Sequence, residues 1–468
     1  MTKRLALVTF GCQMNVHDSQ RIEELMLAAG YEIIADVEGA DVVILNTCSV
    51  REKAEQKLRS EAGRLKKADV ILVVAGCVAQ QEGERLIKSM PYIDIVVGPD
   101  NLAELPALVR DAELGATPAV RTVFDVEDPR FLTNQVREGG VGASAYVTVM
   151  KGCNERCSFC IVPHTRGPER YRSARDIVHE VRALVDGGAR EVVLLGQTVN
   201  SFMDPETPAE IDRDPDESQF PALLRRIAEE APALDRLRYT SPHPRHLTAS
   251  LVRAHADLAV LADHVHMPVQ SGSDRMLKRM IRRYTREEYV SRVDALRTAR
   301  PSLTMSTDII VGFPGETAAD FELTLSLVRE VGFSALYGFK YSPRPFTPAL
   351  RLEDDVSNEE KQTRLLALFE VSDALTRANL ASMVGTRVEV LIEGPSRPGA
   401  STRVGRTRRN EIVHLPGTVG LDAGAVVVAE VARANKHSVE GRLESIKLPA
   451  SAKVMQTHRR VALPVVQA

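Results

Sequence analysis

The stretch Cys153–Cys160 reads Cys-Asn-Glu-Arg-Cys-Ser-Phe-Cys, so its three cysteines are separated by three and by two residues. Thiolates at this spacing can hold three irons of a cubane iron–sulfur cluster while the fourth iron keeps an open coordination position. An open iron can bind a small molecule and pass an electron into it, whereas a cluster with four protein ligands mainly carries electrons. The stretch therefore predicts a catalytic cluster.

A zinc site is the main alternative for these cysteines. His164 lies four residues beyond Cys160 and offers a fourth ligand. Structural zinc sites are usually built from two separated ligand pairs, and the sequence has no Cys-x-x-Cys or His-x-x-x-His pair elsewhere that would complete one. The spacing favours an iron–sulfur cluster, and zinc stays open as the alternative.

Residues 145–378, around this stretch, alternate β-branched runs with helical patterns, which predicts a partial (β/α)6 barrel. The expected strands are Ala145–Met150, Glu191–Leu195, Leu237–Tyr239, His264–Met267, Ser306–Val311 and Ala335–Tyr341. The cysteines follow the first strand directly, which places them at the carboxyl-terminal mouth, where barrel active sites gather.

Polar side chains and tight turns follow the other strands of the predicted barrel, and their repetition around one rim fits a cofactor site. We expect the cofactor to contact Phe159, Gln197, Gln270, Ser306 and Gly312. One predicted helix after the rim carries a basic group that fits either a solvated face or phosphate contacts: Arg275, Lys278, Arg279, Arg282, Arg283 and Arg286. The acidic insert 204–217 predicts a solvated loop without assigned function.

Residues 1–112 predict an open parallel α/β sheet with strands Leu5–Phe10, Asp41–Leu45, Val70–Val74 and Ile93–Val97. The first three strands are each followed by a cysteine: Cys12, Cys48 and Cys77. An isolated cysteine is usually a small buried hydrophobe. Because the carboxyl ends of parallel strands meet at one edge of a sheet, three such cysteines predict a second three-thiolate cluster.

Residues 383–447 switch to short alternating strands between Gly/Pro turns, which predicts a small β-barrel. The expected strands are Thr386–Ile392, Glu411–His414, Val426–Val431 and Val439–Arg442. From Met383 onward there are 13 Lys/Arg against 7 Asp/Glu, a local excess that suits nucleic acid. Residues 386–447 contain no aromatic side chain, so we expect phosphate contacts rather than base stacking, from loop residues Arg403, Arg406, Arg408, Arg409 and Lys436.

Length and composition set the remaining expectations. The 468 residues leave room for about three domains, with a linker at 113–144 and a flexible tail at 448–468. The longest apolar run, 70–75, is far shorter than the roughly 20 residues that span a bilayer, so we expect a cytoplasmic protein without a membrane anchor. Net charge is −3, and six cysteines are too few for a disulfide scaffold, which favours metal or catalytic roles.

From Leu5 to Leu443 the chain resembles the methylthiotransferase family of radical S-adenosylmethionine enzymes, specifically the tRNA-2-methylthio-N6-dimethylallyladenosine synthase branch. Its C-terminal barrel resembles the TRAM domain, an RNA-binding module. The resemblance rests on the stretch at Cys153 and on five further motifs: Thr9–Asn15, Asn46–Ala54, Gly76–Gln81, Pro268–Ser273 and Ile310–Glu316.

The resemblance implies S-adenosylmethionine and two 4Fe–4S clusters as cofactors. Cys153, Cys157 and Cys160 would hold the cluster that cleaves S-adenosylmethionine, and the auxiliary cluster that delivers sulfur would be held by Cys12, Cys48 and Cys77. The implied reaction is methylthiolation of C2 of N6-isopentenyladenosine at tRNA position 37, next to the anticodon. One cofactor molecule donates the methyl group, and a second yields the radical that removes the C2 hydrogen, since an aromatic C–H has no useful acidity.

The resemblance also implies binding partners and leaves alternative functions to weigh. We expect tRNA, a low-potential electron donor of the flavodoxin or ferredoxin type, and a monomeric enzyme. Sister branches modify threonylcarbamoyladenosine in tRNA or an aspartate of a ribosomal protein, but the run Cys48–Lys53 favours the isopentenyladenosine branch. A zinc-containing RNA-binding protein and a pure electron-transfer protein are the alternatives from other classes.

One position departs from the family pattern. Phe346 stands where the family usually has a glycine before Thr347-Pro348. If that glycine has a positive φ, the turn must differ here, because phenylalanine tolerates the left-handed region poorly.

Overall fold

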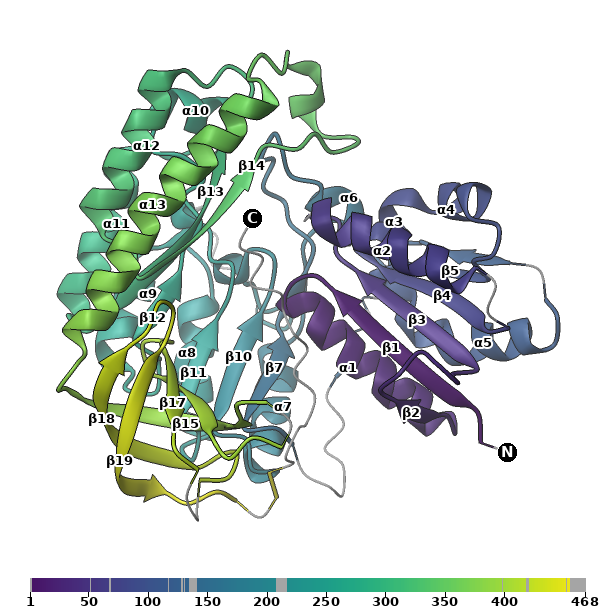
Figure 1. Cartoon of the computed structure of the whole chain (residues 1–468), viewed down its shortest axis with the longest axis horizontal. Coiled ribbons are helices and arrows are strands. Elements are labelled where there is room, and N and C mark those ends of the chain that lie inside the picture. Colours follow the sequence, from purple (N-terminus) through teal and green to yellow (C-terminus); the bar gives the residue numbers. More distant parts are fainter. Residues whose placement is uncertain are drawn as a thin grey trace.

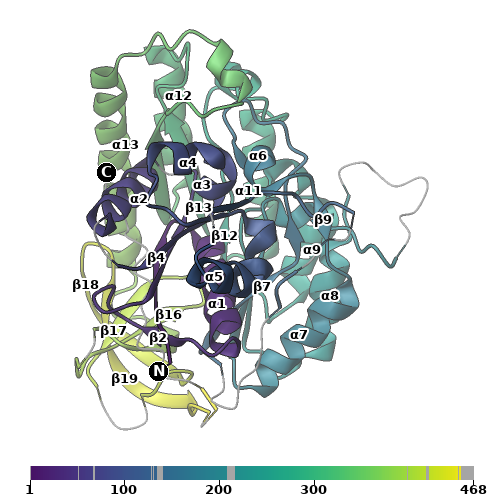
Figure 2. The ribbon, with the colours of Figure 1, turned by 90° about the vertical axis from the view of Figure 1, so that its right-hand side faces the viewer.

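The computed structural model describes residues 2–50, 52–66, 69–116, 118–127, 129, 131–133, 141–207, 217–397, 399–417, 421–451 and 453–454. Figure 1 shows three units: an N-terminal α/β unit on the right, a central barrel on the left, and a small yellow β-barrel below it. Figure 2 looks onto the N-terminal unit, which lies in front of the central barrel. The predicted fold class is therefore confirmed.

The N-terminal unit is a six-stranded parallel sheet of order β2-β1-β3-β4-β5-β6. Its strands are β1 (Arg4–Phe10), β2 (Glu32–Ile34), β3 (Val42–Thr47), β4 (Ile71–Gly76), β5 (Ile95–Val97) and β6 (Ala119–Arg121). The all-apolar β3 is buried throughout, as expected for a strand covered on both faces.

Helices cover both faces of this sheet. Ile22 and Leu105 pack on one face, from α1 (Gln13–Ala28) and α5 (Leu105–Glu113). Leu58, Val78 and Leu86 pack on the other, and they come from α2 (Glu52–Leu65), α3 (Cys77–Glu82) and α4 (Glu84–Ser89). The predicted boundary at 112 is too early, because β6 joins the sheet from within the expected linker.

The central barrel contains all six predicted strands in two parallel three-stranded sheets. The first has the order β11-β10-β7, from β7 (Ser144–Thr148), β10 (Glu191–Leu195) and β11 (Arg236–Tyr239). The second has the order β12-β13-β14, from β12 (His264–His266), β13 (Thr304–Val311) and β14 (Ala335–Lys340). A bridge between Leu237 and Leu261 connects the two sheets.

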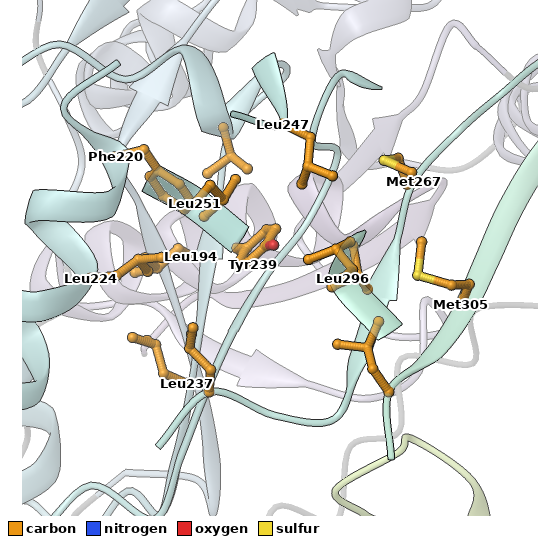
Figure 3. Packing of buried hydrophobic residues seen from close by; sticks show 14 of the residues in the cluster. Leu194, Phe220, Leu224, Leu237, Tyr239, Leu247, Leu251, Met267, Leu296 and Met305 are labelled. Carbon is orange, nitrogen blue, oxygen red and sulfur yellow. The ribbon is translucent and has the colours of Figure 1, made fainter. Parts of the chain in front are cut away.

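Helices surround these strands. They are α7 (Ala174–Asp186), α8 (Phe220–Glu230), α9 (Ala249–Asp257), α11 (Arg286–Ala299), α12 (Ala318–Val331) and α13 (Asn358–Ser382). Figure 3 shows the core between strands and helices, where Tyr239 lies among leucines of both and Met267 and Met305 approach from the second sheet. Smaller elements at the rim are β8 (Met150–Lys151), β9 (Arg170–Tyr171), α6 (Val162–Arg166) and α10 (Asp274–Arg279).

The C-terminal unit is a closed five-stranded barrel of order β15-β16-β17-β19-β18. Its strands are β15 (Arg387–Pro395), β16 (Arg403–Thr407), β17 (Ile412–Leu415), β18 (Val426–Ala434) and β19 (Val439–Leu448). The sequence did not predict β16, because its Arg-Val-Gly-Arg-Thr run has one apolar side chain and no alternation. Arg403 and Arg406 therefore lie on a strand and not in loops, which corrects the expectation.

The chain beyond the small barrel begins as an ordered segment rather than a free tail. Val454 forms a parallel bridge with Val141, and Lys453 Nζ donates to the carbonyl of Asp186 at 3.1 Å. Residues 455–468 lie outside the described residues, as do 208–216 of the acidic insert. Among the described residues, no helix combines the length and the apolar character needed to span a membrane.

Candidate functional site

Three neighbouring strands bring Cys12, Cys48 and Cys77 to one edge of the N-terminal sheet. β1, β3 and β4 lie side by side in parallel, and the amide of Cys48 donates to the carbonyl of Phe10 at 2.9 Å. Gly11 makes this approach possible: its φ is 145°, and a Cβ there would lie 2.5 Å from Cys48 Cβ. The three cysteines that were predicted to converge therefore do lie together.

The thiols at this edge interact with one another. A hydrogen bond with the Cys48 thiol lowers the pKa of Cys12 to about 6, and the same bond raises the pKa of Cys48. Asn15 Oδ1 accepts from both the amide and the thiol of Cys12 at 3.3 Å. Asn46 holds Asn15 in turn, since its Nδ2 donates to the Asn15 carbonyl at 2.9 Å. Buried amides thus fix the first turn of α1 around the cysteine.

Arg166 connects this edge to the central barrel. It is buried, its Nε donates to Cys77 Sγ at 3.3 Å, and its Nη2 pairs with Asp18 Oδ2 at 2.5 Å. Burial opposes the ionisation of Asp18, but the charge of Arg166 and hydrogen bonds from His17 and Arg166 outweigh it and lower the pKa of that carboxyl to about 2. Arg166 ends α6, six residues after Cys160. One short segment thus touches both cysteine groups.

Cys153, Cys157 and Cys160 lie in a loop between β8 and α6 that neighbouring loops clamp. The amide of Ser158 donates to the Met280 carbonyl at 3.0 Å, and its carbonyl accepts from the amide of Ala349 at 2.8 Å. Burial raises the pKa values of Cys153 and Cys160 to about 12. These thiols therefore need a cationic partner to ionise, which is what an iron–sulfur cluster supplies.

Arg282 plays the same part here that Arg166 plays at the other group. Ile281 and Arg283 both have positive φ, at 58° and 56°, and this kinked chain turns Arg282 inward. Its Nη1 donates to Cys157 Sγ at 3.2 Å, while Nη2 and Nε donate to the Pro268 carbonyl and the Tyr284 hydroxyl at 2.9 Å. Each cysteine group therefore has one thiol that accepts from a buried guanidinium.

The geometry fits clusters better than single zinc ions. Within the described part of the chain, the one group with three candidate ligand atoms within 4.8 Å of one another is Glu155, His243 and His246. The three sulfur atoms of neither cysteine triad all lie within that distance of one another. The ligands of a single zinc ion would, because each lies about 2.0–2.3 Å from the metal. His164 does not turn toward the cysteines as a fourth ligand, since its ring lies beside Phe346 at 5.5 Å between centroids.

Of the five predicted cofactor contacts, Phe159 belongs to the cysteine loop, Gln197 contacts the residue before it, and Gln270 and Gly312 lie where barrel strands end. Phe159 packs edge-on against Phe313, with ring centroids 6.4 Å apart. Gln197 Oε1 accepts from the amide of Gly152, beside Cys153. Gln270 is buried with a φ of 77°. Gly312, at the end of β13, has a φ of 67°, and a Cβ there would lie 2.2 Å from Lys361 Cγ, so the fold alone requires glycine at this position.

Ser306 lies low in the barrel, away from the carboxyl-terminal rim where the cofactor is expected. It is the third residue of β13, five residues before the carboxyl end of that strand. Its hydroxyl contacts His264 Nε2 at 3.0 Å and His266 Nδ1 at 2.9 Å. The expected strand Ser306–Val311 also began at this residue, so the sequence pattern itself already placed Ser306 at the end of the strand away from the rim. Its contact with the cofactor stays a prediction, and its place in β13 does not favour it.

A polar group next to Cys153 joins the predicted Gln197 to Glu155, His243 and His246, which were not assigned to the site from the sequence. His246 Nε2 lies 3.1 Å from Glu155 Oε1. Among the described residues, Glu155 Oε2, His243 Nε2 and Gln197 Nε2 are buried without a hydrogen-bond partner. Burial and the nearby Arg282 keep the pKa of His243 well below its usual value, so this imidazole is neutral. Buried polar atoms without partners are costly, and a bound polar ligand would satisfy them.

The five basic residues predicted to contact RNA all have partners within the protein. Arg408 donates to the carbonyls of Asp235, Ala259 and Leu261, which precede β11 and β12. The other contacts are Arg403 with the Leu421 carbonyl, Arg406 with Glu393, Arg409 with Asn379 and Glu411, and Lys436 with Asp373. Arg408 thus docks the small barrel on the central one, and RNA contacts by these five residues stay a prediction.

The basic group after Gln270 is also largely engaged. Arg275 pairs with Asp320, and Arg286 pairs with Glu330. Arg279 Nε donates to the Pro314 carbonyl at 3.0 Å, and Arg282 serves the cysteine loop. These four arginines therefore hold parts of the barrel wall together, which fits a structural role better than a free phosphate-binding face.

Comparisons with known proteins agree with this arrangement. Residues 4–98 match UPF0004, an uncharacterized protein family, residues 147–328 match the radical SAM superfamily, and residues 381–443 match the TRAM domain. Among solved structures, the radical S-adenosylmethionine methyltransferase TsrM from Kitasatospora setae is similar in fold. Its TM-score is 0.51 at 16% identity, over 75% of this chain and 77% of that one.

Curated relatives match over nearly the whole chain. The tRNA-2-methylthio-N(6)-dimethylallyladenosine synthase of Sorangium cellulosum is 60% identical over 94% of this chain and 93% of its own length. Enzymes of the same name from Geobacter metallireducens and Acidithiobacillus ferrooxidans are 45% and 42% identical, over 94% and 98% of this chain and 98% and 100% of their own lengths. The chain belongs to the tRNA-2-methylthio-N(6)-dimethylallyladenosine synthase family of radical S-adenosylmethionine enzymes.

Proposed function

We propose that this chain methylthiolates C2 of N6-isopentenyladenosine at tRNA position 37, giving 2-methylthio-N6-isopentenyladenosine. The observation that carries the proposal is the pair of three-cysteine groups joined by α6, because Cys160 precedes this helix and Arg166 at its end donates to Cys77. The names of relatives at 42–60% identity support the same activity and favour it over the sister branches.

Two clusters are part of this proposal. We infer that Cys153, Cys157 and Cys160 hold a 4Fe–4S cluster with S-adenosylmethionine, and that Cys12, Cys48 and Cys77 hold an auxiliary 4Fe–4S cluster. When bound, the first supplies the electron that cleaves S-adenosylmethionine, and the second supplies sulfur. Three thiols in each group leave one iron of each cluster without a protein ligand.

The chain's own residues prepare the site for radical chemistry. Arg166 and Arg282 each donate to one cysteine sulfur, which stabilises a more negative cluster. The unpartnered Gln197 Nε2 and His243 Nε2 offer donors to a polar cofactor, and Glu155 Oε2 offers an acceptor. His243 Nε2 carries the ring proton because Nδ1 accepts from the Arg245 amide. Lys151 and Arg170 both pair with Asp100, joining the barrel mouth to the N-terminal unit. Such closure supports the exclusion of water that a radical requires.

Partners and location follow from the same activity. The TRAM domain supports tRNA as the macromolecular substrate. A low-potential flavodoxin or ferredoxin would supply electrons, because cleavage of S-adenosylmethionine needs one electron that the protein does not hold. We further propose that the enzyme is a cytoplasmic monomer.

Anaerobic reconstitution with iron and sulfide tests the proposal. The wild type should hold about eight irons per chain, and with S-adenosylmethionine, reductant and isopentenylated tRNA it should form the methylthio nucleoside, detected by mass spectrometry. Cys157→Ala should lose cofactor cleavage and keep about four irons. Cys48→Ala should keep cleavage and lose sulfur insertion. Methylthiolated product from the Cys48 variant would contradict the sulfur-donor role, and zinc binding without cofactor cleavage by the wild type would refute the activity.

A further inference from the structure

Phe346 adopts a backbone conformation that its side chain disfavours. Its φ is 66°, so the different turn that the sequence led us to expect is not seen, and the phenylalanine itself takes the left-handed conformation. Hydrogen bonds of the neighbouring residues hold this turn in place. Arg344 donates to Glu55 Oε2 and to the Val50 carbonyl at 3.0 Å, and Thr347 Oγ1 donates back to the Arg344 carbonyl at 2.7 Å. Strain held in this way often marks a functional position.

The strained turn exposes the aromatic ring instead of burying it. Phe346 is 57% exposed, although the core offers many apolar neighbours. The His164 ring lies 5.5 Å away at a 39° tilt, and the Arg85 guanidinium carbon lies 5.8 Å from the centre of the Phe346 ring. These neighbours come from α6 and α4, so the ring sits where the N-terminal unit and the barrel rim meet.

The place of the ring connects it with the reaction. His164 lies between Cys160 and Arg166 on the segment that touches both cysteine groups. The small C-terminal barrel has no Phe, Tyr or Trp from 386 to 447, so a large aromatic ring for base stacking must come from another part of the chain. An exposed ring flanked by an arginine and a histidine suits a partner that is both anionic and aromatic. Single-stranded RNA has both properties, since its backbone is anionic and its unpaired bases stack on aromatic side chains.

We propose that Phe346 is a stacking platform for an unpaired anticodon-loop base that neighbours the adenosine entering the site. The inference rests on the proposed function, since it takes tRNA as the substrate. It assigns to Phe346 a positioning role in RNA binding and no part in cofactor cleavage. The ring orients the loop while the cysteine groups carry the chemistry.

The test compares Phe346→Gly, Phe346→Trp and Leu350→Ala in the reconstituted holoenzyme. Glycine relieves the positive φ, so this variant removes the ring without straining the fold. Leu350 is also exposed, in the short helix Pro348–Arg351 that follows the Phe346 turn, and is not aromatic. The RNA probe is an isopentenylated anticodon stem–loop with 2-aminopurine beside the target adenosine. Binding is followed by anisotropy, and stacking by quenching of 2-aminopurine.

We expect Phe346→Gly to weaken binding about 5- to 150-fold, as loss of one stacked base predicts, and to abolish the quenching. Uncoupled cleavage of S-adenosylmethionine and thermal stability should stay at or above wild type. Phe346→Trp and Leu350→Ala should bind as the wild type does.

Two results would overturn the inference: wild-type binding and quenching by Phe346→Gly, or an equal loss in Leu350→Ala. Turnover of full tRNA by the wild type is measured in parallel. Absence of the methylthio product there refutes the proposed function, while the binding comparison still decides the role of Phe346.

Discussion

Replacing Arg166 by methionine and Asp18 by asparagine together removes the guanidinium that donates to Cys77 Sγ without leaving a buried charge unpaired. The single Arg166 change would strand Asp18, and such losses cost about 3–5 kcal/mol. In the double variant, the net charge of the pair stays the same, and the specific loss is one charged N–H···S hydrogen bond at 3.3 Å. We expect the auxiliary cluster to become harder to reduce, because this bond stabilises the more negative state.

The size of the effect follows from the strength of the bond. A hydrogen bond with a charged partner contributes about 1.5–3 kcal/mol. For one electron, about 1.4 kcal/mol corresponds to ~59 mV. The midpoint potential of the auxiliary cluster should therefore fall by about 60–130 mV, and the potential of the cluster at Cys153 should not move.

Electron paramagnetic resonance during a redox titration measures this shift. The titration is run in a Cys153→Ala/Cys157→Ala/Cys160→Ala background, so that the auxiliary cluster alone gives a signal. Arg175→Met is the matched control, because Arg175 is an exposed arginine that pairs with Asp176 and Glu206. A midpoint potential in the double variant that equals that of the control would show that Arg166 does not act on the cluster.

Three further outcomes are expected. Gly11→Ala should cost the auxiliary site its roughly four irons in an iron assay, because the new Cβ would lie 2.5 Å from Cys48 Cβ, whereas Gly63→Ala, with no atom within 4 Å, should keep them. The pKa of Asp18, about 2 against the usual 3.8, means that ionised Asp18 stabilises the fold above about pH 4, and this stabilisation is lost as the pH falls through about 2. In acid denaturation, the free energy of unfolding of the double variant should therefore fall by about 2 kcal/mol less than that of the wild type over this pH window. Arg408→Ala should lower the melting temperature in calorimetry by loosening the small barrel; unchanged stability with weaker tRNA binding would instead support the RNA contact predicted for Arg408.

The sequence predicted the elements that depend on local pattern. The six barrel strands and β1, β3, β4 and β5 of the N-terminal sheet have β-branched runs that stand out from their surroundings. β2 (Glu-Ile-Ile) and β6 (Ala-Val-Arg) each carry a charged residue, unlike the equally short β5 (Ile-Val-Val), and β16 is held by barrel closure rather than by its own alternation. The grouping of Cys12, Cys48 and Cys77 was predictable because parallel strands fix where their ends lie.

The parts that escaped prediction depend on tertiary contacts. Nothing in the sequence around Arg166 or Arg282 shows that a buried guanidinium will reach a cysteine. The cysteine that accepts from Arg166 is 89 residues away in the chain, and the one that accepts from Arg282 is 125 residues away. The arginines of the small barrel suggested RNA by composition, yet Arg408 binds carbonyls of the central barrel. Glu155, His243 and His246 meet only because different barrel strands end at one rim.

The docking of Arg408 also limits what can serve as a substrate. The carbonyls that accept from it precede β11 and β12, so the small barrel sits at the amino ends of strands whose carboxyl ends face the cysteine loop. The eight residues of β13 extend about 26 Å between these ends. If the small barrel contacts the RNA whose base reaches the cysteine loop, that RNA must span at least this distance, which a free nucleoside cannot do.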